Sequence, residues 1–593
     1  MLTKKNLKCD LCVIGGGLSG MCAAIAAARE GIKVVLMHER PMLGGNASSE
    51  IRMWISGCVG ENNRETGIIE EIELENMYRN PTKNFSIWDT VLYGIVKQEK
   101  NITLLLNCTC MQAEVEQGEY AYNRDRKIKS ITGYQMTTQC FYEVQAKYYC
   151  DSSGDSILAP LCGAQYRLGR EAASEFNERT TVQVADTMTM GMSCLLQARE
   201  TNEKILFTPP DWSLVLTGKD FENRDLDIYF EGQNFWYLEL GGNRNTIDDT
   251  EEIRDDLISL AIGTWSYIKN SGIYNADAWD LDFIGFLPGK RESRRMIGEY
   301  LLTQKDVSEG KIFPDEVAYG GWPLDDHYPG GFYHRGAPNE HIPTPAPYSI
   351  PYRALYSKNV DNLLFAGRNI SATHTAMSST RVMGTCALLG EAVGKAVAVA
   401  TRKGFAPHDV YLYEMEQVQN MLMSEGCFLP SKVRAISDIC KNAILEGANE
   451  DVRNGRDRLH VLYADADKEI VTASENNPIR YKFSETRVNF VHITFDSDIK
   501  RSTLEGGWIE RERSMRAMRK LNSPQLHMPT TLCKEFELIG KRKGESRCLL
   551  SVKINRKRNY HIAVNEILDE LVLIPKATWG DDKKVPVISF DFN

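Results

Sequence analysis

The order of apolar and polar positions along the chain predicts an α/β protein. Near the N-terminus, an apolar run at 11–14 is typical of a buried strand, small residues at 21–30 favour a helix, and a second apolar run follows at 32–37. The pattern recurs far down the chain, with a strand at 362–366 and a helix of almost only small residues at 384–400. Two glycines one turn apart in this last helix allow the very close packing that such a helix needs.

The middle of the chain differs from these segments in the kinds of residue that it contains and in their order. Residues 234–243 are rich in aromatic side chains and predict a strand, and 248–272 predict an amphipathic helix that begins with acidic residues. A strand at 279–284 precedes a cluster of arginines, and 320–353 read as a long Gly/Pro loop with three histidines. Long loops without regular structure tend to be functional, so we expect this region to form a substrate-binding insert.

The C-terminal third changes character twice. Residues 408–427 and 431–448 predict helices. Short alternating strands follow, and we predict that they form a β-sandwich. These strands are expected at 487–498, 548–555, 570–580 and 585–593. The predicted organisation is therefore a nucleotide-binding domain in two parts, 1–190 and 351–402, an insert at 191–350, a helical connector at 403–450 and a sandwich at 451–593.

The composition of the chain indicates which kinds of partner and which cellular compartment to expect. The net charge is −10 and no basic run is present, which argues against a nucleic-acid partner. The 15 cysteines are scattered without framework spacing, so free thiols in a reducing compartment are favoured. No apolar stretch reaches the roughly 18 residues that a membrane span needs. We therefore expect a cytoplasmic protein without nucleic-acid or membrane partners, and the sequence leaves a homo-oligomer open.

The first helix follows a nucleotide signature. Gly15, Gly17 and Gly20 form G-x-G-x-x-G between the first strand and the helix, and Glu39 ends the second strand. Gly15 would make the tight turn, Gly17 would let the backbone approach a pyrophosphate, and Gly20 would let helix and strand pack closely. The helix N-terminus would attract the phosphates, and Glu39 would accept hydrogen bonds from ribose hydroxyls.

Four further segments carry a family resemblance. They are "RPMLGGNASSEIR" after Glu39, "DSSGD" at 151–155, and "GRNISATH…STRVMGT" from Gly367, with "GKRESRRMIGEY" between the last two. Together with the glycine signature they resemble the large flavoproteins of the glutathione reductase superfamily, in particular the succinate dehydrogenase and fumarate reductase branch. The resemblance covers about residues 8–400. It implies an FAD-dependent oxidoreductase with a Rossmann-like domain and an inserted α+β domain. Together with the C-terminal all-β sandwich that the strand pattern predicts, the expected fold class is α/β.

The resemblance also implies which residues lie along the cofactor. They are Gly15, Gly17, Leu18, Ser19, Gly20, Glu39, Arg40, Gly44, Gly45, Asn46, Ser49, Gly154, Asp155, Gly367, Arg368, Ser379, Thr380, Arg381, Val382 and Met383. The N-terminus of the small-residue helix would face the flavin ring, where its positive dipole end would stabilise the reduced form. Some relatives carry a histidine that bonds covalently to the flavin after the Gly-Gly pair. Asn46–Ser49 stand there in this chain, so we expect non-covalent FAD.

Candidate catalytic residues come from the insert and from the last flavin segment. Arg294 or Arg381 could hold a substrate oxygen, and pairing with interface acids is the structural alternative for the arginines near 291–295. His327, His334 and His341 recur every seven residues; a metal site is less favoured than substrate contact, with His334 taken as the candidate. His374 is predicted as the proton-transfer group beside flavin N5, with hydrogen bonding to backbone near the cofactor as the alternative.

The sequence leaves three functions in competition. The favoured one is hydride transfer between flavin N5 and a small polar substrate, with a sugar or sugar acid among the candidates. The second is a carbohydrate-binding or scaffold protein that keeps a flavin fold without turnover, because the C-terminal strands resemble galactose-binding modules. A flavin-dependent RNA-modifying enzyme is weaker, given the acidic balance. Since every cofactor motif ends before Ala400, the C-terminal region is predicted to be dispensable for flavin binding.

Overall fold

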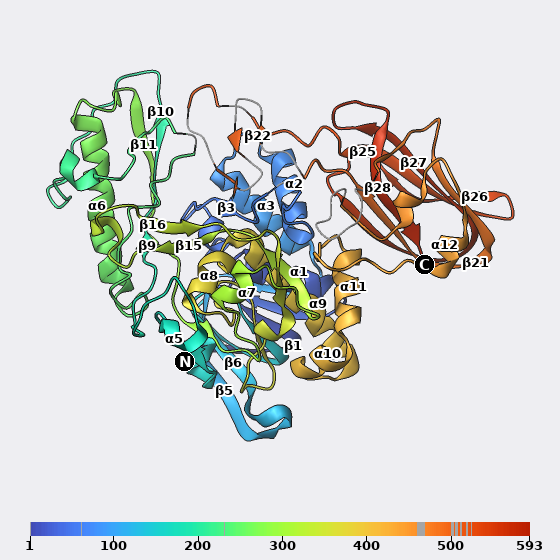
Figure 1. Cartoon of the computed structure of the whole chain (residues 1–593), viewed down its shortest axis with the longest axis horizontal. Coiled ribbons are helices and arrows are strands. Elements are labelled where there is room, and N and C mark those ends of the chain that lie inside the picture. Colours follow the sequence, from blue (N-terminus) through green and yellow to red (C-terminus); the bar gives the residue numbers. More distant parts are fainter. Residues whose placement is uncertain are drawn as a thin grey trace.

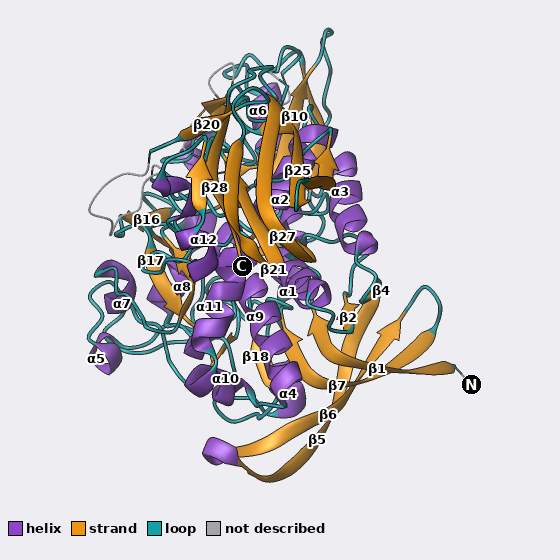
Figure 2. Cartoon of the chain, turned by 90° about the vertical axis from the view of Figure 1, so that its right-hand side faces the viewer, coloured by secondary structure: helices purple, strands orange, loops and turns teal. Residues whose placement is uncertain are grey.

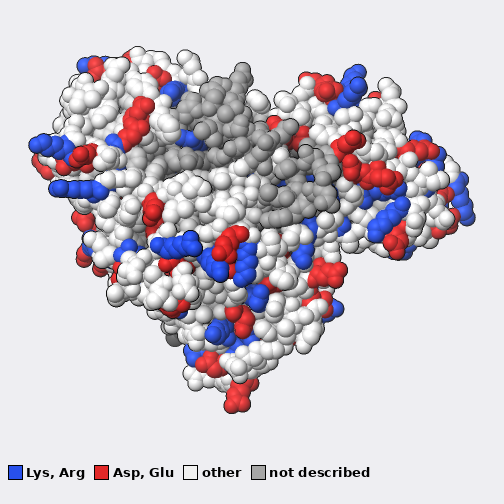
Figure 3. Space-filling model, viewed as in Figure 1, with Lys and Arg blue, Asp and Glu red and all other residues white. Residues whose placement is uncertain are grey.

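We describe a computed structural model of the chain. It covers residues 2–60, 62–230, 232–458, 469–499, 503–504, 508–509, 513–516, 520–523 and 525–593. A nucleotide-binding domain lies in the centre, the insert packs on one side of it and the C-terminal sheet on the other (Figure 1). Acidic and basic side chains are interspersed on the face that Figure 3 shows.

The central sheet is mixed, with the strand order β4-β2-β1-β7-β6-β5 and β18 beside β7. Five strands are parallel: β1 (Thr3–Ile14), β2 (Val34–Met37), β4 (Ile102–Leu105), β7 (Cys140–Asp151) and β18 (Leu363–Phe365). An antiparallel extension is made by β5 (Cys108–Tyr120) and β6 (Arg124–Gln135). The predicted strands at 11–14, 32–37 and 362–366 are confirmed, and β18 returns the distant last segment to the same sheet.

Two helices of small residues pack directly on each other beneath this sheet. They are α1 (Leu18–Arg29) and α9 (Met383–Lys403). A Cβ at Gly390 would collide with the carbonyl oxygen of Ser19, and one at Gly394 would lie 2.6 Å from that of Ala23. The predicted close packing of the late helix is therefore confirmed, and its partner is the first helix of the nucleotide motif.

Within the described residues, α9 is the one helix long and apolar enough to cross a membrane, so the expectation from the sequence that no stretch reaches this length was wrong. Of its apolar window, 94% is buried inside the protein. This burial marks α9 as a core helix, because it packs between α1 and the neighbouring elements. These include α2 (Ile68–Arg79), β14 (Glu316–Gly320) and α11 (Met415–Ser424).

The insert is built on one long helix and several short strand pairs. Helix α6 (Thr250–Asn270) confirms the predicted amphipathic helix, and β11 (Trp279–Ile284) confirms the predicted strand, which pairs with β10 (Leu196–Glu200). The strand predicted at 234–243 is wrong: this segment is made of turns, with one isolated bridge at Leu240. Its aromatic residues instead fill the core of the insert beneath α6.

The predicted long loop at 320–353 is only partly a loop. Strands β15 (Leu324–His327) and β16 (Asn339–Ile342) form an antiparallel hairpin. Strand β17 (Tyr348–Pro351) pairs with β14. Glycine and proline concentrate between these strands, which is why the composition concealed them. Two short antiparallel pairs lie nearby. Strand β9 (Met192–Ser193) pairs with β12 (Gly289–Lys290), and β8 (Tyr166–Arg167) pairs with β13 (Arg295–Met296).

Short helices and connectors complete the first 450 residues. They are α3 (Phe85–Gln98), α4 (Leu158–Cys162), α5 (Ala173–Phe176), α7 (Gln304–Ser308), α8 (His374–Thr380), α10 (Pro407–Tyr413) and α12 (Asp438–Asn442). The helix predicted at 408–427 is present as α10 and α11. The helix predicted at 431–448 is wrong except for α12, because Ser437 caps a single turn and β19 (Ile444–Glu446) then joins the C-terminal sheet.

The C-terminal region is all antiparallel. Its strands are β20 (Val471–Ala473), β21 (Ile479–Phe495), β25 (Cys533–Arg542), β26 (Glu545–Val552), β27 (Asn559–Thr578) and β28 (Val585–Phe592). With β19 they make one hydrogen-bonded sheet of seven strands, ordered β20-β28-β21-β27-β25-β26 (Figure 2). All four strand segments predicted here are confirmed, whereas a two-sheet sandwich and the likeness to galactose-binding modules stay predictions.

Two more short pairs come from the chain between β21 and β25. Strand β22 (Thr503–Leu504) pairs with β23 (Trp508–Ile509). Strand β24 (Arg513–Ser514) is not part of the C-terminal sheet. It pairs with β3 (Ile55–Ser56) in the nucleotide-binding domain. The C-terminal region is thus tied by backbone hydrogen bonds to the domain that it follows.

Candidate active site

One cavity lies where the predicted cofactor segments meet. It is bounded by the glycine loop after β1, the Gly-Gly loop after β2, the loop after β7, and the start of α9. Its other side is formed by the insert, chiefly by the β15–β16 hairpin and the β9–β12 pair. A cavity at the carboxyl ends of parallel strands is where nucleotide cofactors bind in α/β folds.

The three motif glycines have different structural roles. Gly15 has a φ of +101°, and a Cβ there would collide with the carbonyl oxygen of Ser152. A Cβ at Gly20 would collide with the carbonyl oxygen of Gly15. By contrast, a Cβ at Gly17 would meet only the Cα of Gly45, at 3.8 Å. Gly15 and Gly20 are therefore required by the fold itself, whereas Gly17 borders open space in the cavity.

The donors at this end fit a pyrophosphate and ribose. The glycine loop and the Gly-Gly loop run together through a parallel bridge between Gly17 and Gly44, and the backbone at the start of α1 faces the cavity. The hydroxyl of Ser19 is buried there without a hydrogen-bond partner among the described residues. Glu39 also lines the cavity, with 41% of its side chain exposed. Buried unpaired polar groups are costly, so their presence points to a ligand that pairs them.

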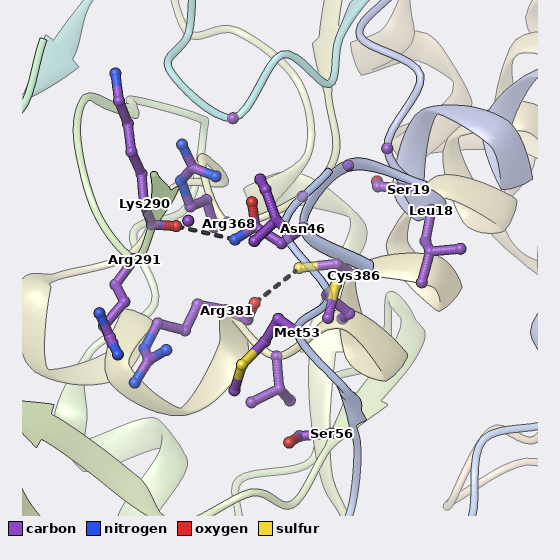
Figure 4. Close-up of a pocket in the computed structure, with 18 of the residues that line it drawn as sticks. Leu18, Ser19, Asn46, Met53, Ser56, Lys290, Arg291, Arg368, Arg381 and Cys386 are labelled. Atoms are coloured by element: carbon purple, nitrogen blue, oxygen red, sulfur yellow. Dashed lines mark hydrogen bonds between the residues drawn. The ribbon is translucent and has the colours of Figure 1, made fainter. Parts of the chain in front are cut away.

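The start of α9 forms the opposite wall, as expected from the sequence. Val382 precedes the helix, Met383 begins it, and Cys386 follows on its first turn; all three line the cavity. Asn46 reaches the insert by donating to the carbonyl oxygen of Lys290 at 3.1 Å (Figure 4). A helix N-terminus in this position supplies positive potential to whatever lies against it.

Most of the residues that we predicted to bind the cofactor line this cavity. They are Gly15, Gly17, Leu18, Ser19, Glu39, Arg40, Gly44, Gly45, Asn46, Gly154, Gly367, Arg368, Arg381, Val382 and Met383. Five lie behind its wall instead: Gly20, Ser49, Asp155, Ser379 and Thr380. Asp155 holds Arg368 and Lys290 in place through ion pairs of 2.7 and 2.9 Å. Ser379 bonds to the hydroxyl of Tyr348 at 2.6 Å.

The β15–β16 hairpin brings four polar side chains to one side of the cavity. Asp325 is paired in register with His341, and His327 is paired with Asn339. Since alternate residues of a strand share a face, all four point the same way, and all four line the cavity. Asn339 donates to the carboxylate of Asp325. The seven-residue spacing of the histidines therefore reflects a hairpin.

His327 is held by a buried carboxylate. Its Nδ1 lies 2.6 Å from Oε2 of Glu239, and its Nε2 lies 3.5 Å from Oδ1 of Asp325. Burial alone would raise the pKa of Glu239, but Arg291 and His327 outweigh it and lower the pKa. An ionised carboxylate only accepts hydrogen bonds, so we assign the Nδ1 proton of His327 to this bond. The Nε2 side of the ring then faces the hairpin and the cavity.

Two arginines lie side by side in the same part of the cavity (Figure 4). Arg291 is 9% exposed, donates to the Ser193 hydroxyl at 3.0 Å and lies 3.4 Å from Glu239. Arg381 donates to Asp325 at 3.1 Å, and its Nε is buried without a partner in the part of the chain that the structure describes. Burial lowers the pKa of Arg291, and the charge of Arg381 lowers it further. Two neighbouring guanidinium groups are well suited to hold a substrate oxygen.

His374 lies outside the cavity. Its Nδ1 is 2.9 Å from Glu292 and its Nε2 is 2.9 Å from Asp326, so both ring nitrogens are engaged by carboxylates. Burial alone would lower the pKa of His374, but these two carboxylates raise it to about 10. A ring that stays protonated near neutral pH cannot exchange a proton readily. The geometry therefore speaks against the predicted catalytic role and favours a structural one.

Two of the other three predicted catalytic residues, Arg294 and His334, also lie elsewhere. Arg294 donates to the carbonyl oxygen of Asp155 at 3.3 Å and lies 5.5 Å from the ring centroid of Tyr166. His334 stacks on Tyr328 at 4.0 Å between ring centroids. Neither lines the cavity, whereas Arg381 does.

Sequence reasoning did not select several residues that line the substrate side. They are Met53, Trp54, Ser56, Ser193, Leu195, Trp236, Lys290, Trp322, Asp325, His327, Asn339 and His341. Asp325, His327 and His341 were visible as a polar cluster, and the hairpin alternation of 324–327 and 339–342 was the signal that could have placed them. Trp54, Trp236 and Trp322 lie far apart in the sequence, and no local sequence pattern indicates that they line one cavity.

The fold and the site together define a dinucleotide-binding flavoprotein of the oxidoreductase type. A family model described as FAD dependent oxidoreductase matches residues 10–422. The chain belongs to this family, its cofactor is FAD, and the protein is an FAD-dependent oxidoreductase. The unpaired hydroxyl of Ser19 and the open space at Gly17 fit that cofactor.

Solved structures of individual proteins resemble this chain only weakly in sequence and in fold. A geranylgeranyl bacteriochlorophyll reductase-like protein from Thermoplasma acidophilum is 12% identical, with a TM-score of 0.30, over 71% of this chain and 86% of the other. E. coli quinol fumarate reductase is 12% identical, with a TM-score of 0.26, over 71% and 78%. Adenylylsulfate reductase from Archaeoglobus fulgidus is 12% identical, with a TM-score of 0.27, over 72% and 74%. No curated protein matches the chain. Similarity this low carries no substrate or mechanism to this chain.

Proposed function

We propose that the enzyme transfers a hydride between flavin N5 and a small polar substrate, with His327 as the proton-transfer group. The supporting observation is that Asp325, His327, Arg291 and Arg381 line the same cavity as the cofactor glycines. Bound FAD would supply the hydride acceptor or donor. The chain has to orient the substrate, hold its oxygen and move one proton.

His327 is suited to the proton transfer because of the carboxylate behind it. Its Nε2 lies 3.5 Å from Asp325, a looser contact than the 2.9 Å between each nitrogen of His374 and its carboxylate. With its Nδ1 proton donated to Glu239, the Nε2 of His327 can therefore take the proton of a substrate hydroxyl when a C–H bond is oxidised. In the opposite direction it returns that proton to a carbonyl oxygen. Glu239 fixes the tautomer and stabilises the charge that forms on the ring.

The two arginines would hold the substrate oxygen. Arg381 offers an unpaired Nε, and Arg291 is anchored by Ser193 and Glu239, so neither guanidinium needs a large rearrangement to accept a new partner. Hydrogen bonds from charged donors are about twice as strong as neutral ones. Trp236 and Trp322 add aromatic walls to this polar site, a combination that suits a sugar or sugar acid.

Anaerobic flavin bleaching tests the proposal. Holoenzyme would be mixed with sugars, sugar alcohols and sugar acids, and the visible flavin band followed. For a substrate that bleaches it, His327→Gln should keep its FAD but reduce the flavin about a hundredfold to ten-thousandfold more slowly. His334→Gln is the matched control, because this half-buried ring lies outside the cavity. A His327→Gln holoenzyme that is reduced at the wild-type rate would contradict the assignment.

A further inference from the structure

A short segment of the C-terminal region lies against the wall of the flavin cavity. Strand β24 pairs with β3 in antiparallel register, with Arg513 opposite Ser56 and Ser514 opposite Ile55. Ser56 and the preceding Trp54 line the cavity. Strand β24 therefore lies directly beside β3, and the segment that contains β3 forms part of this wall.

The segment is anchored on the nucleotide-binding domain by buried contacts. The hydroxyl of Ser514 accepts from Arg64 at 3.1 Å and donates to Glu73 on α2. Met515 is 2% exposed and belongs to the main core, where Asn76 donates to its sulfur at 3.1 Å. These contacts hold the residue that follows in a defined place.

Arg516 joins the cavity wall to the insert. Its guanidinium carbon lies 5.1 Å from the ring centroid of Trp54 and 4.7 Å from that of Phe230. A Cβ at Gly232 would collide with the Arg516 side chain, so the insert packs closely on it. Lys83 donates to the Arg516 carbonyl oxygen at 3.2 Å. The side chain is 2% exposed, and contacts of a cation with aromatic faces strengthen when they are desolvated.

We propose that Arg516 is a positioning residue for Trp54, through which the C-terminal region shapes the substrate side of the flavin cavity. Trp54 is 5% exposed, and its ring fills part of the cavity wall. Arg516 contacts both the Trp54 ring and Phe230 of the insert. Without Arg516, Trp54 loses that support and the insert loses a contact that ties it to the nucleotide-binding domain.

This role differs from a contribution to stability alone. A purely structural contact would change the unfolding temperature and leave the surroundings of the bound flavin as they are. A positioning role changes those surroundings in folded, fully flavinated protein. The visible circular dichroism of bound flavin reports its asymmetric environment, and the rate of flavin reduction by dithionite reports how open the cavity is.

The test compares Arg516→Ala holoenzyme with wild type in both measurements, after flavin content and unfolding temperature are recorded. We expect an altered visible dichroism spectrum and at least a twofold faster reduction by dithionite. Arg516→Lys keeps a cation between the rings and should restore most of both properties. The matched control is Lys534→Ala, since Lys534 lies 5.4 Å from the ring of Trp579 in the C-terminal sheet, away from the cavity.

Wild-type dichroism and reduction rate in folded Arg516→Ala would overturn the proposal. So would an equal change in Lys534→Ala, because the effect would then be a general one of the C-terminal region. If Arg516→Ala does not fold, Phe230→Ala decides: it removes the insert's side of the contact at a ring that is 47% exposed. Faster reduction of that variant supports the proposal, and an unchanged rate overturns it.

Discussion

Replacing His374 with alanine should destabilise the protein rather than disable its chemistry. The ring lies between the carboxylates of Glu292 and Asp326, and the histidine and glutamate side chains are 1% and 0% exposed. Arg295 also pairs with Glu292, at 2.6 Å. Removing the histidine would leave two buried or half-buried carboxylates short of a partner.

The pKa gives the size of this effect. One pKa unit corresponds to about 1.4 kcal/mol, so raising the pKa of His374 from its ordinary 6.5 to about 10 corresponds to about 5 kcal/mol in favour of the folded state. Breaking a buried ion pair by removing one partner costs about 3–5 kcal/mol. Because Arg295 still pairs with Glu292 in the variant, we expect the lower part of that range.

The pH dependence has a definite sign. The pKa of His374 is higher in the folded than in the unfolded protein, so its stabilisation is fully present below about pH 6.5. It decreases as the pH rises and is lost near pH 10. The difference in unfolding free energy between wild type and His374→Ala should therefore shrink steadily over this interval.

Denaturant unfolding of both proteins at several pH values measures this difference, and flavin reduction by substrate is measured on the same samples. His334→Ala serves as the control, since that ring stacks on Tyr328 away from the ion pairs. The reasoning is refuted if His374→Ala unfolds like wild type at every pH while its flavin reduction falls a hundredfold. That result would restore the catalytic role expected from the sequence.

Three shorter predictions concern packing and the cofactor. Gly390→Ala should lower stability by more than about 3 kcal/mol or prevent folding, because its Cβ would collide with the backbone of Ser19; thermal unfolding checks this, and a wild-type transition would contradict it. Since every cofactor motif ends before Ala400, the sequence predicts that a chain ending near Glu446 keeps FAD. Such a chain lacks Ser514–Arg516 beside β3, so the structure indicates weaker flavin retention, which an FAD titration measures; wild-type affinity would contradict this. Acid precipitation should release the flavin into the supernatant, and flavin that stays with the precipitate would show a covalent link.

The nucleotide half of the site could be predicted because its physics is local. Gly15, Gly17 and Gly20 lie within six positions, and each role follows from a turn or a close approach that the motif itself creates. The partner of α9 could not be named, yet its composition already required close packing. A short apolar run predicted the strand at 362–366 and the family resemblance assigned it to the nucleotide-binding domain, but its pairing with β7 was not predicted.

The substrate half was harder because its geometry comes from tertiary contacts. Asp325 and His341 are far apart in sequence, and only the hairpin register makes them neighbours. His374 was placed by its distance along the chain from Arg381, but the first turn of α8 directs its ring toward Glu292 and Asp326 instead. Neither carboxylate gave a sequence signal for that contact.

The most direct test of this account is the flavin content of Gly17→Val. The Cβ of residue 17 would meet only Gly45, at 3.8 Å, so the fold should tolerate valine, whereas a pyrophosphate against this backbone should not. We predict a folded, colourless protein with an unfolding temperature close to that of wild-type apoprotein, while Gly20→Ala, whose Cβ would collide with Gly15, should fail to fold stably. A fully flavinated Gly17→Val protein would contradict the placement of FAD in this cavity.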